Sequence, residues 1–382
     1  MPVPTSPSAD VVVIGAGVVG ASCAWHATRA GLQVTVLDRG PVAGGTTGAG
    51  EGNLLVSDKP PGPELDLARL SVRLWREIAR ELGDVEYETK GGVVVADSEA
   101  GLAELHRTSA EQRSAGIEAV TVPAAALSDY EPHLAPDLHG GVYYPEDAQV
   151  QPMLAAARLL ADARAHGARV LPGHEVTALL RDGARVVGAR TAATRHPATA
   201  VINAAGTWGQ TVASFADLDL PVLPRRGFIL VTEPLPRVVR HKVYAAEYAS
   251  NVASDDQGLQ TSPVVEGTAA GPVLIGSSRE RVGFDRTVSV PVLRALAAHA
   301  IRLLPVLADV AVIRAYRGFR PYSPDHLPII GPDPRAPGLL HACGHEGAGV
   351  GLAAATGRLL VQVLTGARPD VDLRPFRPER FA

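Results

Sequence analysis

A glycine-rich segment near the N-terminus constrains the fold more than any other part of the chain. Residues 10–39 read DVVVIGAGVVGASCAWHATRAGLQVTVLDR. The apolar, β-branched residues 11–14 are typical of a strand that is buried on both faces. A glycine turn follows, then a helical segment over residues 18–29, and then a second apolar strand over residues 34–37. The order of these elements predicts one complete β-α-β unit.

The glycines of the turn have the spacing G-x-G-x-x-G. Gly15 permits the tight turn, Gly17 lets the backbone approach a pyrophosphate, and Gly20 lets the helix pack closely against the strand. The helix N-terminus, at Val18 and Val19, presents free N–H groups and the positive end of its dipole to the phosphates. In this context the spacing predicts a dinucleotide-binding turn.

Asp38 closes the second strand and is followed by Arg39. We expect the Asp38 carboxylate to accept hydrogen bonds from a ribose, and its charge disfavours the 2′-phosphate of NADP, which leaves FAD and NAD. The next stretch, residues 41–53, reads PVAGGTTGAGEGN, where an NAD enzyme would continue into an ordinary helix and a third strand. Its backbone N–H groups and the hydroxyls of Thr46 and Thr47 are suited to a second phosphate or a flavin ring.

Composition restricts the class of protein. The chain has 382 residues, of which 46% are hydrophobic and 20% charged, so two globular domains are expected. A net charge of −4 gives no general attraction to nucleic acid or to an anionic membrane. The two cysteines, Cys23 and Cys343, cannot build a disulfide framework, which favours a reducing cytoplasm. Residues 1–9 predict a disordered lead-in and no signal peptide, and we expect no transmembrane segment.

The middle of the chain departs from the nucleotide-binding pattern. Apolar residues at helical spacing over 65–82 predict an amphipathic helix, and the chain then crosses at residues 85–96 into a second domain. Strand-like runs at 228–232 and 273–277, separated by Pro, Gly and Asp, favour an antiparallel sheet. Residues 199–206, TAVINAAG, form another buried strand, and the small residues at its carboxyl end let a cofactor come close.

The sequence YRGFRPYSPDHLPIIG, residues 316–331, places Arg320 between apolar neighbours. Pro321 forces an extended backbone before it. A guanidinium in such surroundings needs an anionic partner, because burying it alone is costly. A substrate carboxylate held by two parallel hydrogen bonds is one fitting partner, and a protein carboxylate such as Asp325 is the other.

A second glycine-rich turn follows near the C-terminus. Residues 339–357 read LLHACGHEGAGVGLAAATG, which predicts an apolar strand, a turn, and a helix that runs to about residue 364. The N-terminus of this helix also points free N–H groups at an electron-rich group.

The β-α-β unit with GGTTGAGEGN, together with the segments around Arg320 and HEGAG, resembles the D-amino-acid-oxidase-like FAD oxidoreductases. That family includes glycine oxidase, D-amino acid dehydrogenase and the hydroxyproline dehydrogenase subunits. The resemblance implies an α/β fold with a FAD-binding Rossmann-like nucleotide domain and an antiparallel-sheet substrate domain. The cofactor contacts that it implies are Thr46, Thr47, Glu51, Gly52, Asn53, Val176 through its main chain, Ala205, Gly206, His345, Glu346, Gly347, Gly349, Val350 and Gly351.

The resemblance also implies a reaction. The C–N bond of an amino acid or secondary amino acid, of the D-amino acid, hydroxyproline or opine type, would be oxidised to the imine by hydride transfer to flavin N5. Arg320 would hold the substrate carboxylate. Tyr244 or Tyr248 could close over the substrate, and His345 or Glu346 could assist proton transfer.

The chain departs from the family pattern at two positions. Glycine oxidase has a second arginine where this chain has Gly347, which puts simple glycine in doubt as the substrate. Monomeric sarcosine oxidase ties its flavin to a cysteine near the position of Arg320, and this chain has no cysteine there. We therefore expect noncovalent FAD.

The expected domains are discontinuous. The FAD-binding domain comprises residues 10–84, 140–215 and 318–370, and the substrate domain comprises residues 85–139 and 216–317. The expected partners are a small amino acid substrate and an electron acceptor, which is oxygen, a quinone or a partner electron-transfer subunit. Two alternatives stay open. One is the FAD subunit of a hetero-oligomeric amino acid dehydrogenase, and the other is an NAD-dependent enzyme or a non-redox nucleotide-binding regulator.

Overall fold

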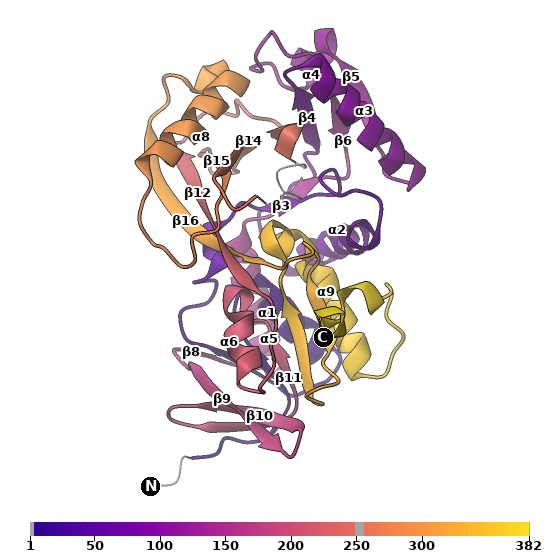
Figure 1. The fold of residues 1–382 in the computed structure, drawn as a ribbon, viewed down its shortest axis with the longest axis vertical. Helices are drawn as coiled ribbons and strands as arrows, with labels where there is room; N and C mark the ends of the chain where they lie inside the picture. Colours follow the sequence, from indigo (N-terminus) through magenta and orange to yellow (C-terminus); the bar gives the residue numbers. More distant parts are fainter. Residues whose placement is uncertain (1–3, 249–255, 382) are drawn as a thin grey trace.

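The computed structural model describes residues 4–248 and 256–381 and shows two regions, one above the other in Figure 1. Each region is organised around an eight-stranded sheet. The α-helices of the described residues are α1 (Val18–Arg29), α2 (Pro63–Leu82), α3 (Glu99–Ser114), α4 (Leu127–Tyr130), α5 (Pro152–Ala165), α6 (Gly209–Ser214), α8 (Val290–Leu303) and α9 (Gly349–Leu364).

The lower sheet in Figure 1 contains the glycine-rich unit. Its strands are β1 (Ala9–Ile14), β2 (Val34–Asp38), β8 (Arg169–Pro172), β9 (Val176–Asp182), β10 (Arg185–Thr191), β11 (Arg195–Asn203), β17 (Ile329–Pro332) and β18 (Leu339–Cys343). The strand order is β17-β18-β11-β1-β2-β8, with β10 and β9 joined to β11. The run from β18 to β8 is parallel, and β17 and β10 are antiparallel to their partners.

The residues of β1 alternate between two apolar layers, as expected for a strand that is covered on both faces. Val11 and Val13 pack in a cluster with residues of α1, α2, α5 and α9. Val12 and Ile14 pack on the other face with residues of β10 and α6. The helix predicted over residues 18–29 is confirmed as α1. The β-α-β unit therefore forms the centre of this region.

The upper sheet is mostly antiparallel. In spatial order its strands are β16 (Val312–Tyr322), β12 (Leu223–Thr232), β15 (Val273–Arg279), β14 (Gln260–Gly267), β13 (Lys242–Ala245), β4 (Gly92–Ala96), β6 (Gly140–Tyr144) and β5 (Val120–Pro123). The pair β13 and β4 is parallel. One face, with Val93 and Phe228, packs under α8. The other face, with Val94 and Val264, joins the cluster that contains α2 and α9, so the two regions share a core.

Sheet membership differs from the expected domain boundaries. Residues 140–215 are expected in the FAD-binding domain, but β6 pairs with β4 and β5 in the upper sheet. The strand β16 also crosses the expected boundary after residue 317, because its pairing with β12 runs from Val312 to Tyr322. Strand partners lie far apart in the sequence, so a local pattern does not reveal which sheet a strand joins.

Part of the N-terminal lead-in lies against the lower sheet. Ser6 N donates to Arg195 O at 2.9 Å, and Arg195 N donates to Pro4 O at 2.8 Å. Thr5 forms a β-bridge with the same Arg195. The disorder predicted for residues 1–9 therefore does not apply to residues 4–9, and residues 1–3 lie outside the described residues.

One helical stretch within the described ranges, Glu346–Leu364, is long and apolar enough to cross a membrane by length and composition alone. It is 61% buried, and its helix α9 packs against α1 and α2. A helix that is covered on several sides by protein needs an apolar surface all round, so its packing accounts for its composition.

Candidate active site

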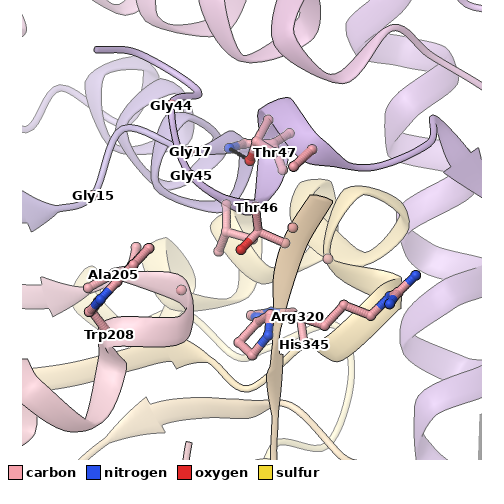
Figure 2. Close-up of a pocket in the computed structure, with 18 of the residues that line it drawn as sticks. Gly15, Gly17, Gly44, Gly45, Thr46, Thr47, Ala205, Trp208, Arg320 and His345 are labelled. Carbon is pink, nitrogen blue, oxygen red and sulfur yellow. Dashed lines mark hydrogen bonds between the residues drawn. The ribbon is translucent and has the colours of Figure 1, made fainter. Parts of the chain in front are cut away.

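A cavity is lined by the carboxyl ends of β1, β2 and β11 and by residues of β12 and β16 (Figure 2). Open α/β sheets bind their ligands at this end of the strands. Most of the predicted site residues meet here. They are Gly15, Gly17, Val18, Val19, Asp38, Arg39, Thr46, Thr47, Glu51, Asn53, Val176, Ala205, Gly206, Tyr248, Arg320, His345, Glu346, Gly347, Gly349 and Val350.

The lining does not include four predicted residues, which are Gly20, Gly52, Gly351 and Tyr244. The glycines among them are needed for backbone packing. A Cβ at Gly20 would overlap the carbonyl of Gly15, and a Cβ at Gly52 would overlap that of Val150. A Cβ at Gly351 would lie 3.2 Å from Asn53 O. These glycines therefore allow the backbone segments behind the cavity wall to pack closely against one another.

Tyr244 corrects the sequence-based prediction. Its side chain is buried in the core, and its hydroxyl forms a hydrogen bond with Ser57 Oγ. Tyr248, which follows β13, does line the cavity. The two rings are in edge contact, with centroids 5.2 Å apart. Tyr244 belongs to a strand of the sheet, and this places its ring behind that of Tyr248.

The nucleotide end of the cavity is held together by local backbone contacts. Gly15 has a φ of +116°, and a Cβ there would overlap the carbonyl of Ala204 at the end of β11. Asp38 Oδ2 accepts a hydrogen bond from Ala16 N at 2.7 Å, and Oδ1 accepts one from Gly40 N at 2.8 Å. The carboxylate therefore fixes the glycine turn to the loop after β2, and it keeps lone pairs for a ribose.

The loop after β2 connects the nucleotide end to the upper sheet. Thr47 Oγ1 accepts a hydrogen bond from Val18 N at 3.0 Å, and a dashed line in Figure 2 marks it. Thr46 Oγ1 donates to Phe319 O at 2.7 Å, and Thr207 Oγ1 donates to the same carbonyl at 2.6 Å. Because Phe319 precedes Arg320 in β16, this loop positions the strand that carries the arginine.

Two helices begin at the cavity. Gly17 precedes α1, and Gly349 and Val350 in the first turn of α9 line the wall. The first turns of α1 and α9 contain no acidic residue and no side-chain cap from their own segments. Both positive dipole ends are thus open to an electron-rich ligand.

Trp208 lines the cavity beside the 3₁₀ turn Gly206–Trp208. The Arg39 guanidinium lies 3.9 Å from the centre of its ring. On the other side Phe284 stacks on Trp208 at a centroid distance of 5.4 Å. Trp208 is thus held in the cavity wall between these two side chains' contacts.

Arg320 lies across the cavity from Thr46 and Thr47, next to His345 (Figure 2). Its Nη1 donates to Ser278 O at 2.8 Å. Within the described parts of the chain, Arg320 forms no ion pair within 4 Å, and the alternative partner Asp325 instead pairs with Arg380 at 2.6 Å. Burial, aided by the charge of Arg279, lowers the pKa of Arg320 to about 10, so the side chain is a cation at neutral pH.

Gly227 explains how the Arg320 side chain fits, and sequence reasoning missed it. It pairs with Gly318 across β12 and β16, and a Cβ at Gly227 would overlap Arg320 Nη1. Both glycines line the cavity. Only the register of two strands separated by some ninety residues could reveal this role.

Glu346 is buried and already paired within the protein. Its Oε1 lies 2.5 Å from Arg225 Nη1, and its Oε2 lies 3.2 Å from His326 Nδ1. Burial alone would raise the pKa of Glu346, but the hydrogen bond with His326 and the charges of Arg225 and Arg279 lower it to about 2. Glu346 is therefore a carboxylate at neutral pH.

His345 lies in the cavity wall beside Glu346, but its ring is buried. Its Nε2 lies 3.0 Å from Thr356 Oγ1. Burial lowers the pKa of His345 to about 3, so the imidazole is neutral under ordinary conditions.

Glu51 is another carboxylate in the wall. Asn53 Nδ2 donates to its Oε2 at 3.3 Å, and its Oε1 has no hydrogen-bond partner among the described residues. Burial raises the pKa of Glu51, while the charge of Lys242 acts in the opposite direction. Lys242 forms a buried ion pair with Glu266, which also accepts a hydrogen bond from Gly52 N.

These residues fit an extended dinucleotide with a flavin ring. The open N-terminus of α1 suits a pyrophosphate, Asp38 suits a ribose, and the N-terminus of α9 suits the electron-rich end of a flavin. The unpartnered Glu51 Oε1 is an acceptor in the wall between these ends. We expect FAD to be held by these groups.

Comparisons with known proteins agree with this geometry. The family model DAO, FAD dependent oxidoreductase, matches residues 10–363. Hydrogen cyanide synthase subunit HcnC of Pseudomonas aeruginosa is 32% identical over 97% of this chain and 96% of its own length. Glycine oxidase of Pseudomonas putida is 30% identical over 97% of this chain and 99% of its own length.

A solved structure shows the same fold. Glycine oxidase from Geobacillus kaustophilus superimposes with a TM-score of 0.88 and is 26% identical over 97% of this chain and 98% of its own. The family match spans both sheets and every segment of the cavity wall. The resemblance predicted from the sequence is confirmed, and the chain belongs to the DAO family of FAD dependent oxidoreductases.

Proposed function

We propose that this FAD-dependent oxidoreductase oxidises the C–N bond of an amino acid or a secondary amino acid to the imine, with the substrate carboxylate held by Arg320. The observation that carries this proposal is a half-buried arginine in the cavity wall that forms no ion pair within the described residues. A carboxylate is the ligand that its forked geometry fits best. The FAD requirement of the family contradicts the NAD-dependent alternative.

The side chains around Arg320 position the substrate. Bound FAD supplies the acceptor for the hydride. Arg320 orients the substrate through its carboxylate, and Tyr248 lies beside it in the wall. The neutral imidazole of His345 and the paired carboxylate of Glu346 are poor proton acceptors at neutral pH. The amine is therefore expected to enter deprotonated, and the protein contributes mainly by orientation.

Anaerobic reduction of the purified holoenzyme tests the proposal. Flavin absorbance is followed with D-amino acids, proline, hydroxyproline and N-alkylglycines, each beside the amine that lacks its carboxylate. We expect bleaching with acids and little with the decarboxylated amines. Equal bleaching by both members of a pair would contradict a carboxylate-holding role for Arg320.

A second candidate is the FAD subunit of a hetero-oligomeric dehydrogenase. We infer this assembly from the likeness to hydrogen cyanide synthase subunit HcnC. Oxygen uptake by the isolated chain separates the two candidates. Rapid uptake supports an oxidase, whereas turnover only with an artificial acceptor supports a chain that passes electrons to a quinone or a partner.

We also propose that FAD is noncovalent and that the protein is cytoplasmic. Cys23 and Cys343 are both free and buried, and neither lines the cavity. Acid precipitation tests the first point, because noncovalent flavin stays in the supernatant. Fractionation of the source cells tests the second.

A further inference from the structure

A second buried arginine lies beside the cavity. Arg279 ends β15 and is 2% exposed. Its guanidinium lies 4.7 Å from the centre of the Tyr248 ring, and Tyr248 is a residue of the cavity wall. Its Nε has no hydrogen-bond partner, and Arg279 forms no ion pair in residues 4–248 and 256–381. Contact with a tyrosine ring compensates only part of the cost of burying a cation.

Neighbouring cations in the same part of the molecule do have protein partners. Arg225 pairs with Glu346 at 2.5 Å, and Lys242 pairs with Glu266. Arg279, which is buried, and Arg320, which is half-buried, have no carboxylate within ion-pair distance among the described residues. An unpaired buried cation is costly, so this arrangement favours an anion that comes from a ligand.

Arg279 and Arg320 belong to the same small part of the structure. Arg320 Nη1 donates to the carbonyl of Ser278, the residue that directly precedes Arg279. After burial, the charge of Arg279 is the next largest cause of the lowered pKa of Arg320. The Tyr248 ring lies 4.7 Å from the Arg279 guanidinium and lines the same cavity as Arg320. The Glu346 carboxylate also acts on both arginines, but it already pairs with Arg225. A further anion from a ligand would lower the cost of keeping the two like charges close together.

The α-carboxylate of a substrate needs only one of the two arginines. Arg320 keeps Nε and Nη2 for a bidentate pair, and the adjacent Gly347 leaves this side of the guanidinium open, since a Cβ there would lie 3.6 Å from Arg320 Nε. The α-carboxylate is thus satisfied by Arg320 alone. The charge of Arg279 is left for a different acidic group.

We propose that Arg279 binds a second acidic group of the substrate, so that the preferred substrates are amino or secondary amino acids with two carboxylates. This inference rests on the proposed function for the role of Arg320, but the anion site formed by Arg279 is open to a separate test.

The first test measures binding without turnover. Oxidised holoenzyme is titrated with glutarate and with valerate, which has the same chain length and one carboxylate, and the flavin spectrum reports binding. Wild type is compared with Arg279→Met and with Arg314→Met, which removes an exposed arginine lying 5.5 Å from the Tyr316 ring. We expect Arg279→Met to weaken glutarate binding by at least about 30-fold, the lower end for losing one partner of a buried charge pair. Valerate binding should change by no more than about twofold.

The second test uses oxidisable pairs under anaerobic conditions. D-Glutamate is compared with D-norvaline, and iminodiacetate with N-ethylglycine, in wild type and in Arg279→Met. The apparent dissociation constant should rise for the dicarboxylic member of a pair that reduces the flavin, and should hardly change for the other. Thermal stability without ligand should be equal or higher in the variant, because an unpaired buried charge has been removed.

Several results would overturn the proposal. They are equal binding of glutarate and valerate, no spectral change with glutarate at tens of millimolar, or equal losses for both acids in Arg279→Met. A lower melting temperature with unchanged glutarate binding would give Arg279 a structural role. If glutarate binding depends on Arg279 but no amine reduces the flavin, the dianion site stands and the proposed amine oxidation fails.

Discussion

The two ends of the cavity differ in whether their charged side chains already have partners within the protein. At the nucleotide end both carboxylate oxygens of Asp38 accept hydrogen bonds from backbone N–H groups of the same β-α-β unit. At the other end Arg320 Nη1 donates to Ser278 O, and the buried Nε of Arg279 has no partner in the part of the chain that the structure describes. The first end is complete before a ligand binds, whereas at the second end two arginines form no ion pair within the described residues.

The difference separates cofactor retention from substrate recognition. A preformed nucleotide end binds its ligand with little reorganisation. A buried cation that lacks a protein anion discriminates strongly, because a ligand without the matching anion leaves the charge uncompensated. Substitutions at the two ends should therefore affect FAD and substrate separately.

The largest effect is expected at Glu346, the carboxylate that already compensates Arg225 at the substrate end. Glu346→Gln removes the carboxylate that pairs with the buried Arg225 and should lower the free energy of unfolding by about 3–5 kcal/mol. The measurement is a urea transition at fixed excess FAD. A loss as small as that of an exposed pair such as Glu104→Gln would contradict the contrast between paired and unpaired cations.

The same pair has a defined pH dependence. The folded-state pKa of Glu346 is about 2, below its ordinary value of 4.5, so its stabilising effect is complete above about pH 4.5 and is lost as the pH falls toward 2. The stability difference between wild type and Glu346→Gln should be constant from neutral pH to about 5 and then shrink. A difference that grows on acidification would show that the pair is not ionic.

Arg320 is expected to come next. Arg320→Lys removes the forked geometry and should cost about 2–5 kcal/mol in substrate affinity. Anaerobic flavin reduction reports this loss as a higher apparent dissociation constant, while melting temperature and FAD content should remain near those of wild type. Lost flavin with unchanged substrate affinity would show that Arg320 acts in FAD binding and not in substrate binding.

Asp38 tests the nucleotide end. Asp38→Ala removes the acceptor for Ala16 N and Gly40 N, and FAD binding should weaken by about 1–3 kcal/mol. Asp38→Asn keeps one acceptor oxygen and should lose less. The readout is titration of the apoprotein with FAD by fluorescence quenching, and unchanged affinity in Asp38→Ala would remove Asp38 from the cofactor site.

Thr47 should give the smallest effect. Thr47→Val removes the side-chain acceptor for Val18 N at the start of α1, which typically costs about 0.5–2 kcal/mol. The loss should appear in FAD affinity and not in the dissociation constant of the substrate. Thr46→Val is the matched control, because Thr46 bonds to Phe319 O and not to the helix. Equal losses of FAD affinity in the two variants would show that the capping of α1 by Thr47 does not cause the loss.

The sequence by itself determined the nucleotide end of this protein. The bounds of α1, the role of Gly15 and the place of Asp38, Thr46 and Thr47 in one cavity wall all follow from residues fewer than forty positions apart. Periodicity, glycine spacing and helix polarity are local properties, so they can be read without knowing the rest of the fold.

Only the tertiary structure decided the substrate end. Tyr248 lines the cavity and Tyr244 does not, Gly227 makes room for Arg320, and Arg279 lies beside Tyr248. Each of these relations depends on which strands of the upper sheet are neighbours and in which register. Pairing between distant strands is set by the burial of whole faces, and a local sequence pattern does not contain it.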